Sequence, residues 1–204
     1  MKYDQLHPEK VVQRVLSSLN NRGINSELVN TKEEALNRLI ELIPLKAEIM
    51  TAGSTTLEEI GFINLLKSSK HKWKNLKDEL LSEKNELKQE ELRKKSVTAE
   101  FFIGSVHAVT EKGEVLVASA SGSQIPAYSF SSDNLIWIVG VQKIVSNLNE
   151  GFKRIREYVF PLEDKRMKKA GYPGSVIGKI LLFEREIMSN RKITLIFVNE
   201  KLGF

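Results

Sequence analysis

Apolar positions along this chain alternate between a helical period and short extended runs. Between residues 8 and 22 they recur with the 3.6-residue spacing of an amphipathic helix, and Gly23 marks its end. Residues 24–29 form a short extended run. Thr31 to Glu34 is then a capping box, which opens a second helix that ends before Pro44. The chain therefore begins as helix, strand, helix.

The next expected strand, over residues 47–51, runs directly into a turn of small and hydroxylated residues. Thr56 and Glu59 have the spacing of a capping box, which predicts a helix start there. A strand that feeds a glycine-containing turn and a helix start presents free backbone N–H groups to an anion. We therefore expect an anion-binding turn, with a plain helix cap as the alternative, at Gly53, Ser54, Thr55 and Thr56.

Strand-like runs become denser in the second half of the chain. After a charged helical stretch that ends near Thr98, the pattern predicts strands over residues 100–104, 108–110, 114–118, 135–139, 177–184 and 192–199, and helices over 147–158 and 161–169. The runs on either side of Lys112 and Gly113 indicate a hairpin, and the apolar run 135–139 indicates a strand buried on both faces. Strands interleaved with helices predict an α/β fold, a three-layer αβα sandwich with a largely parallel sheet.

Composition narrows the class of protein. The 204 residues are 41% hydrophobic and 28% charged, and no linker-like break interrupts them, so we expect residues 1–204 to form a single globular domain. The chain has no cysteine, which excludes disulfides, zinc–thiolate sites and cysteine-ligated iron–sulfur clusters. His7, His71 and His107 are far apart in sequence, so we expect no metal, and no cofactor is evident.

Charge and hydropathy argue against two classes of partner. Most of the net charge of +5 lies between Lys67 and Lys95, where acidic and basic residues alternate at helical spacing and Trp73 is the only aromatic residue. A nucleic-acid binder would need a continuous basic face or several aromatic residues, so we expect no nucleic-acid partner. No apolar run approaches the roughly 20 residues that cross a bilayer, and the N-terminus lacks a signal-peptide core. We expect a cytoplasmic protein that does not bind membranes.

Further candidate binding residues follow the predicted strands. The turn after the hairpin has small residues and side-chain donors, which suit a second anion-contacting loop or an ordinary surface turn, at Ser121, Gly122, Ser123 and Gln124. Lys143 follows the strand at 135–139, where its charge would meet a substrate at the same rim or would simply be solvated. Glu58 is a weaker candidate, because a helix dipole favours a carboxylate in the first turn in any case. We interpret His107 as structural.

Four stretches together resemble the lactate-utilisation (LUD) domain family: Ala52 to Phe62, Gly104 to Leu116, Val139 to Ser146 and Ile193 to Phe204. The run GSTTLEEIG in the first stretch is the most specific, and Gly104 in the second is included among the candidate substrate-binding residues. The resemblance implies a fold like that of ribose-5-phosphate isomerase and the CoA transferases, whose members bind phosphorylated or acyl-thioester substrates at the C-terminal edge of the sheet.

The resemblance also implies a role in lactate utilisation, where family members act beside iron–sulfur oxidoreductase subunits. Many relatives carry C-terminal cysteines for a cluster, whereas this chain has Tyr172 to Lys179 there and holds no cluster of its own. Many relatives have an arginine in the turn after the hairpin, and Gly122 to Gln124 lacks it. Glu111, in the hairpin turn, is the candidate catalytic residue, a nucleophile or general base as in CoA transferases, with an ordinary polar turn as the alternative.

Two hypotheses follow from the sequence. In the first, the chain binds a small anionic metabolite (phosphorylated, carboxylate or acyl-CoA-like) in organic-acid or lactate metabolism, with the 53–56 turn, the 121–124 turn and Lys143 lining one cleft. Its activity would be isomerase- or transferase-like. In the second, it is a non-catalytic subunit or adaptor of an oxidoreductase complex, which an exposed apolar patch without a polar pocket would favour. Base rates favour a homodimer.

Overall fold

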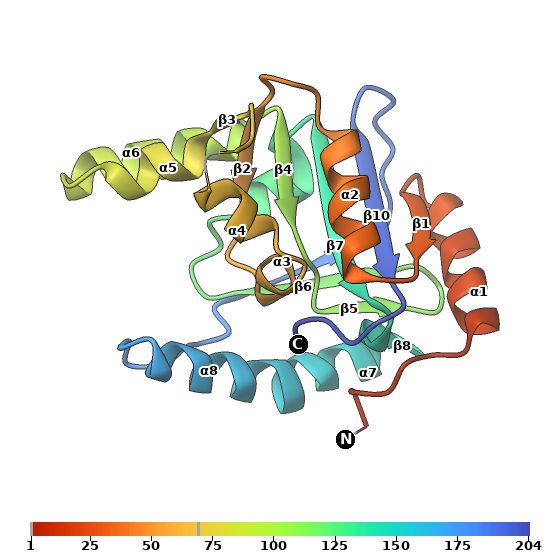
Figure 1. The fold of residues 1–204 in the computed structure, drawn as a ribbon. Helices are drawn as coiled ribbons and strands as arrows, with labels where there is room; N and C mark the ends of the chain where they lie inside the picture. The colour runs from red at the N-terminus through yellow and green to blue at the C-terminus, as the bar shows by residue number, and fades with distance from the viewer. Residues whose placement is uncertain (1, 69) are drawn as a thin grey trace.

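A parallel β-sheet forms the centre of the computed structural model, which describes residues 2–68 and 70–204 (Figure 1). Every pair of neighbouring strands in this sheet is parallel. In spatial order, its six strands are β1 (Asn25–Val29), β10 (Lys192–Val198), β7 (Asn134–Gly140), β4 (Phe101–Gly104), β2 (Glu48–Thr51) and β3 (Lys74–Asn75). The prediction of a largely parallel sheet is confirmed.

A smaller mixed sheet packs beside the parallel one. Its order is β8 (Ile144–Val145), β5 (Ala108–Thr110), β6 (Val115–Ser119) and β9 (Lys179–Phe183). The predicted hairpin is present, because β5 and β6 pair antiparallel, and β9 extends it antiparallel to β6. The pattern along the chain did not predict that these strands would leave the large sheet and form their own.

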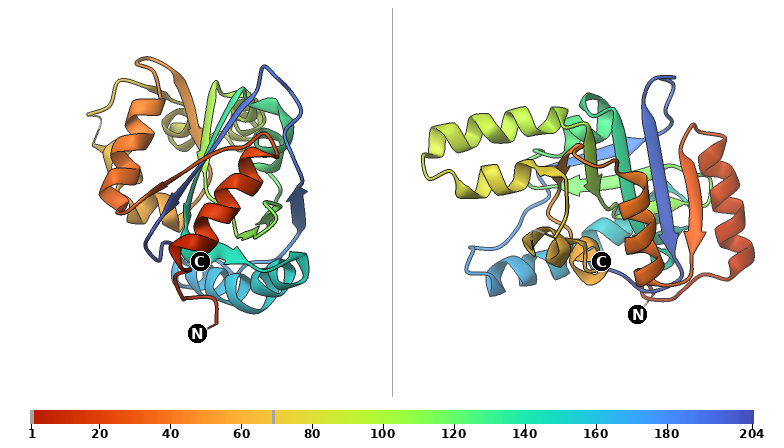
Figure 2. Two further views of the ribbon diagram at one scale, coloured as in Figure 1. Left: turned by 90° about the vertical axis from the view of Figure 1, so that its right-hand side faces the viewer. Right: turned by 45° about the horizontal axis from the view of Figure 1, so that its top comes forward.

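Both faces of the large sheet are buried, which explains why its strands are nearly continuous apolar runs. On β4, Phe101 and Ile103 face a cluster that includes residues of α2 (Lys32–Leu42), α3 (Thr55–Glu59) and α4 (Phe62–Lys67). Phe102, between them, faces the opposite cluster, which includes residues of α1 (Glu9–Asn20), β5, β6 and β9. Figure 2 shows this layering edge-on, and the three-layer prediction is confirmed.

A further helical layer covers the outer face of the small sheet. It runs without interruption through α7 (Leu148–Lys153), the π-helical segment η4 (Arg154–Val159) and α8 (Phe160–Lys169). The sequence predicted two helices with a break before Pro161, and this was wrong. Proline removes one N–H and clashes with the preceding turn, and a wider π-helical turn before it lets the helix continue.

Helices α5 (Leu76–Ser82) and α6 (Glu86–Lys95) project from one end of the molecule (Figure 1). Leu80 anchors α5 in the core, whereas α6 has no buried residue. Among residues 2–68 and 70–204, none of the helices combines the length and the apolar character needed to cross a membrane.

We expect Gly104→Ala to destabilise the protein because a methyl group at the end of β4 would overlap the hydroxyl of the buried Tyr128. Overpacking of this kind costs about 1–3 kcal/mol, measurable as a lower midpoint of urea unfolding. Gly53→Ala is the matched control, since its methyl would meet nothing within 4 Å. Equal midpoints for the two variants would contradict the packing described here.

Candidate functional site

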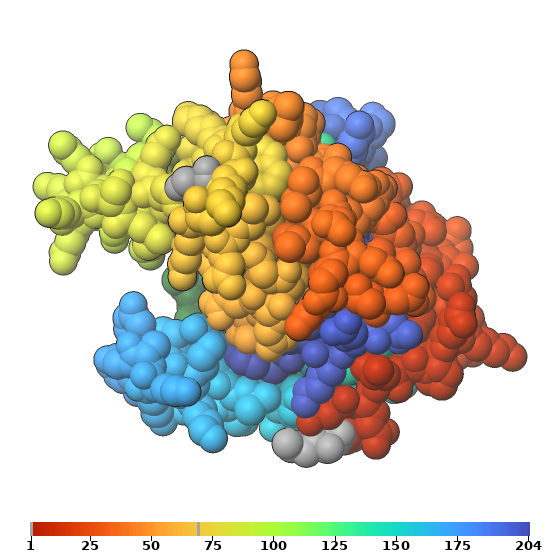
Figure 3. All heavy atoms as spheres, viewed as in Figure 1, coloured from red at the N-terminus to blue at the C-terminus, as the bar shows by residue number. Residues whose placement is uncertain are grey.

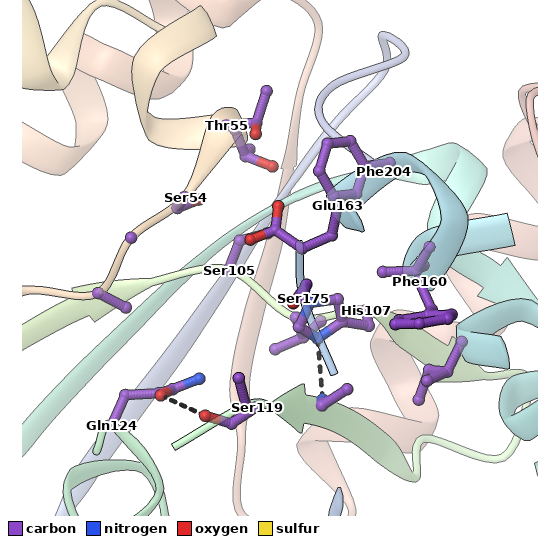
Figure 4. A pocket seen from close by; sticks show the side chains of 18 of the residues that line it. Ser54, Thr55, Ser105, His107, Ser119, Gln124, Phe160, Glu163, Ser175 and Phe204 are labelled. Carbon is purple, nitrogen blue, oxygen red and sulfur yellow. Dashed lines mark hydrogen bonds between the residues drawn. The ribbon is translucent and has the colours of Figure 1, made fainter. Parts of the chain in front are cut away.

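A cavity of about 290 Å³ opens at the carboxyl ends of the parallel strands. The segments that follow β2 and β4, together with Lys143 after β7, form one side, and η4, α8 and residues 175–177 form the other (Figure 4). In Figure 3 the surface is hollowed between the yellow part of the chain and α8 in light blue. Ligands of open α/β sheets bind at this edge. Of the residues proposed from sequence, the cavity is lined by Gly53, Ser54, Thr55, Thr56, Glu58, Ser121, Gln124 and Lys143.

Ser54 begins helix α3, and this corrects the predicted cap. Its hydroxyl accepts a hydrogen bond from the Leu57 backbone N–H at 3.3 Å, so the helix starts one residue before Thr56. Thr56 is therefore inside the first turn and buried, and its hydroxyl is free to face Lys143. Glu59 accepts a hydrogen bond from the Gly203 backbone N–H at 2.6 Å, and so ties the C-terminal segment to α3. The predicted Thr56–Glu59 capping box does not form.

Lys143 is a buried cation at the base of the cavity. A short 3₁₀ turn after β7 carries it, and only 1% of its surface is exposed. Its ammonium group donates to the hydroxyls of Thr56, at 3.0 Å, and Ser105, at 3.1 Å. Burial, and then the charge of Arg154, lowers the pKa of Lys143 to about 7. Near neutral pH the amine is therefore present in both protonation states.

His107 lines the same cavity, although the sequence pattern favoured a purely structural role. Its Nδ1 accepts a hydrogen bond from the Ala118 backbone N–H at 3.0 Å, so the neutral ring carries its proton on Nε2. Burial, followed by the charges of Lys143 and Arg154, lowers the pKa of His107 to about 3. At physiological pH the ring is a neutral hydrogen-bond donor.

Arg154 is another buried cation behind the cavity wall. It has no exposed surface, and one of its terminal nitrogens donates to the main-chain oxygen of His107. Its guanidinium carbon lies 5.2 Å from the centre of the Tyr158 ring, a cation–π contact. Nε and Nη2 have no hydrogen-bond partner within residues 2–68 and 70–204. Burial lowers the pKa of Arg154 to about 10, which leaves it charged at neutral pH.

The 119–124 turn contributes only part of its predicted set. The Ser119 hydroxyl donates to Gln124 Oε1 at 2.9 Å and accepts from the Gly122 backbone N–H at 2.9 Å. The Gln124 amide nitrogen takes no part in this pairing (Figure 4). Gly122, with a φ of 86°, makes the turn, and neither it nor Ser123 lines the cavity.

The opposite wall is apolar, and its rim is charged. Helix residues Ile155, Val159 and Phe160 form this wall together with Val176 and Ile177 of the following loop. At the rim, Arg166 donates two hydrogen bonds to the Glu163 carboxylate, at 2.7 and 2.8 Å. These bonds, and more weakly the Glu58 carboxylate, raise the pKa of Arg166. The cavity is thus cationic at its base and mixed in charge at its mouth.

Glu111 and Gly104 lie outside the cavity. Glu111 sits in the hairpin turn, where its carboxylate pairs with Arg14 at 3.1 Å. Gly104 is buried in β4 against Tyr128. The cavity instead includes Ser105, because it follows β4 directly, and this position after a strand is a signal that sequence reasoning can use. Glu163 and Arg166 gave no such signal, since they lie on a helix far along the chain.

Metal and cluster sites in proteins are built mainly from Cys, His, Asp and Glu side chains. The chain has no cysteine, so it holds no cysteine-ligated iron–sulfur cluster. In the part of the chain that the structure describes, no three His, Asp or Glu side chains are grouped so as to hold a metal ion.

Comparisons with known proteins agree with this architecture. The LUD domain family matches residues 12–179. The solved structure of a DUF162 family protein from Deinococcus radiodurans is similar, with a TM-score of 0.57 and 11% sequence identity over 96% of this chain and 100% of that one. At this identity the structural likeness shows the fold alone. No curated protein matches the chain.

The lowered pKa of Lys143 predicts that stability depends on pH. The ordinary value of 10.5 applies to the unfolded chain and a value of about 7 to the folded protein. Between these values the unfolded state binds more protons, so the free energy of unfolding rises with pH, by at most about 1.4 kcal/mol per unit. Urea unfolding at pH 7, 8 and 9 measures this rise. We expect a smaller rise in Lys143→Met, where Lys77, whose pKa burial also lowers, still contributes.

The exposed Lys10→Met is the control, because removal of a solvated lysine leaves the rise in place. Parallel pH profiles for the wild type and Lys143→Met would contradict the burial of a titrating amine.

Proposed function

This chain belongs to the LUD domain family, and we propose that it binds a small anionic metabolite in the cavity between α3 and α8. The observation that carries the proposal is the environment of Lys143, whose buried ammonium group faces the neutral hydroxyls of Thr56 and Ser105. A buried charge whose hydrogen-bond partners are neutral is costly, and the Glu59 carboxylate favours the charged form of Lys143 without outweighing the burial. An anion in the cavity would offset that cost. The ligand class is therefore phosphorylated, carboxylate or acyl-thioester.

Neutral donors around Lys143 would complete the binding of an anion. The Ser54 and Thr55 side chains line the cavity on the α3 side, and the His107 ring offers its Nε2–H from the other. Helix α3 has only five residues, so its dipole adds little and the side chains carry the interaction. These groups suit oxygen atoms of a carboxylate or phosphate.

The apolar wall favours an organic ligand over a bare inorganic ion. Ile155, Val159 and Phe160 would contact a hydrocarbon part of the ligand while Lys143 contacts its acidic group. Such a division between an apolar lining and a few placed polar groups is usual in small-molecule sites. We propose a role in organic-acid or lactate metabolism on the same grounds, together with family membership. An exposed apolar patch without a polar cavity would instead favour an adaptor role.

We expect a ligand to raise the melting temperature of the wild type in a thermal-shift screen of lactate, other 2-hydroxy acids, sugar phosphates and acyl-CoA thioesters. A ligand that binds only the native state stabilises it. Lys143→Met should lower the affinity for that ligand about tenfold to a hundredfold, because a charge-assisted hydrogen bond contributes about 1.5–3 kcal/mol. Isothermal titration calorimetry measures the change, and Lys10→Met is the control.

The same titration should depend on pH. An anion prefers the protonated amine, so its affinity falls as the pH rises above 7, by at most about tenfold per unit. In Lys143→Met that dependence should vanish. A ligand that binds the variant as tightly as the wild type would show that Lys143 is not the anion-binding group.

A further inference from the structure

A second, smaller recess opens beside the cavity and shares part of its wall. Ala52, Gly53 and Gln124 line both spaces. The recess, of about 60 Å³, lies between the end of β2, the first turn of α5 and the 119–124 turn. Its remaining polar lining includes Lys77 and Ser123, and Ser123 is one of the predicted binding residues that the main cavity omits.

Lys77 gives the recess a positive charge that lacks a carboxylate partner. Its ammonium group donates to the main-chain oxygen of Thr51 at 3.3 Å, and it forms no ion pair with a carboxylate of residues 2–68 or 70–204. The neighbouring acids Asp78 and Glu79 are on the same helix, and Glu79 raises the pKa of Lys74 instead. Burial, then the charge of Arg93 on α6, lowers the pKa of Lys77. Lys77 therefore brings a partly buried positive charge to the recess, and the charge of Arg93 adds to the positive potential around it.

We propose that this recess is an anion subsite for a phosphate-like group, and that the ligand of the main cavity is elongated, with one acidic group beside Lys143 and a second beside Lys77. This inference rests on the proposed function of the main cavity and names the ligand class more narrowly. The ligand is a metabolite whose two acidic groups are joined by a short uncharged body, as in a phosphorylated organic acid. The shared residues Ala52 and Gln124 flank that body.

Gly53 lies at the boundary of the two spaces, because it lines both. A Cβ at this position would meet no atom within 4 Å, and Gly53 has no positive φ that would require a glycine. A larger side chain therefore fits at this boundary without straining the backbone. The Gln124 amide nitrogen takes no part in the bond to Ser119 and is a donor at the same boundary.

Inorganic phosphate, pyrophosphate, tripolyphosphate and tetrapolyphosphate form a series of probes of increasing length. Titration calorimetry at pH 7 without divalent cations should show that the best of the linear polyphosphates binds the wild type at least about tenfold more tightly than phosphate, because linked groups engage two subsites at once. Lys77→Met should remove this gain, because the second acidic group loses its cation. Gly53→Val should also reduce the gain, because it places a branched side chain at the boundary that the two spaces share.

Lys74→Met is the matched control and should keep the gain, since Lys74 lies on β3, three residues before Lys77, and pairs with Glu48 at the surface. The recess is not an anion subsite if Lys77→Met keeps the wild-type gain, or if the wild type binds every probe equally. In either case the proposed function still stands when Lys143→Met weakens the binding of phosphate. If Lys143→Met binds every probe as the wild type does, the proposed function fails as well. Circular dichroism identifies any variant that misfolds. Because the Lys77→Met and Gly53→Val tests are independent, one of them remains if the other variant misfolds.

Discussion

The site depends on the parallel pairing of β2, β4 and β7, because parallel strands deliver their carboxyl ends to one edge of the sheet. This constraint brings together the 53–56 turn, Ser105 and Lys143, which are far apart in the chain. The site also requires β7 to end beneath the C-terminal segment. A side chain at Gly140 would lie only 2.8 Å from the Glu200 oxygen and the Leu202 nitrogen, so this contact requires a glycine.

Buried charge then determines the chemistry of that edge. Lys143 and Arg154 are both buried beside the cavity, and the charge of Arg154 adds to the burial that lowers the pKa of Lys143. Burial, and then the charges of these two residues, keep His107 neutral. A protein core without a functional demand replaces such groups with apolar side chains at no loss of stability. Buried cations beside an open, hydroxyl-lined space therefore fit our proposal that the cavity binds an anion.

The sequence was sufficient for the order of elements and for one side of the site. Local signals, such as Gly23 after the first helix and the apolar run of β7, act within a few residues and can be read directly. The apolar wall could not be read, because η4 and α8 reach the cavity only through packing against the small sheet. The burial of Lys143 was equally hidden, since nothing in the sequence near it distinguishes a buried amine from a solvated one.

The exposure of α6 has a consequence for the entropy of the protein. Helix α6 has no buried residue, and Leu92 is only partly buried against the core cluster, so α6 opens locally at a lower cost in free energy than the buried helices. Arg93 belongs to this helix, so its charge adds to that of Lys77 over the first turn of α5 only while α6 is ordered. Any anion attracted by that field also selects the ordered helix. Part of the binding free energy of that anion then orders α6, which lies away from the sheet. Amide hydrogen exchange in α6 would therefore report whether the recess is occupied, although α6 does not line it.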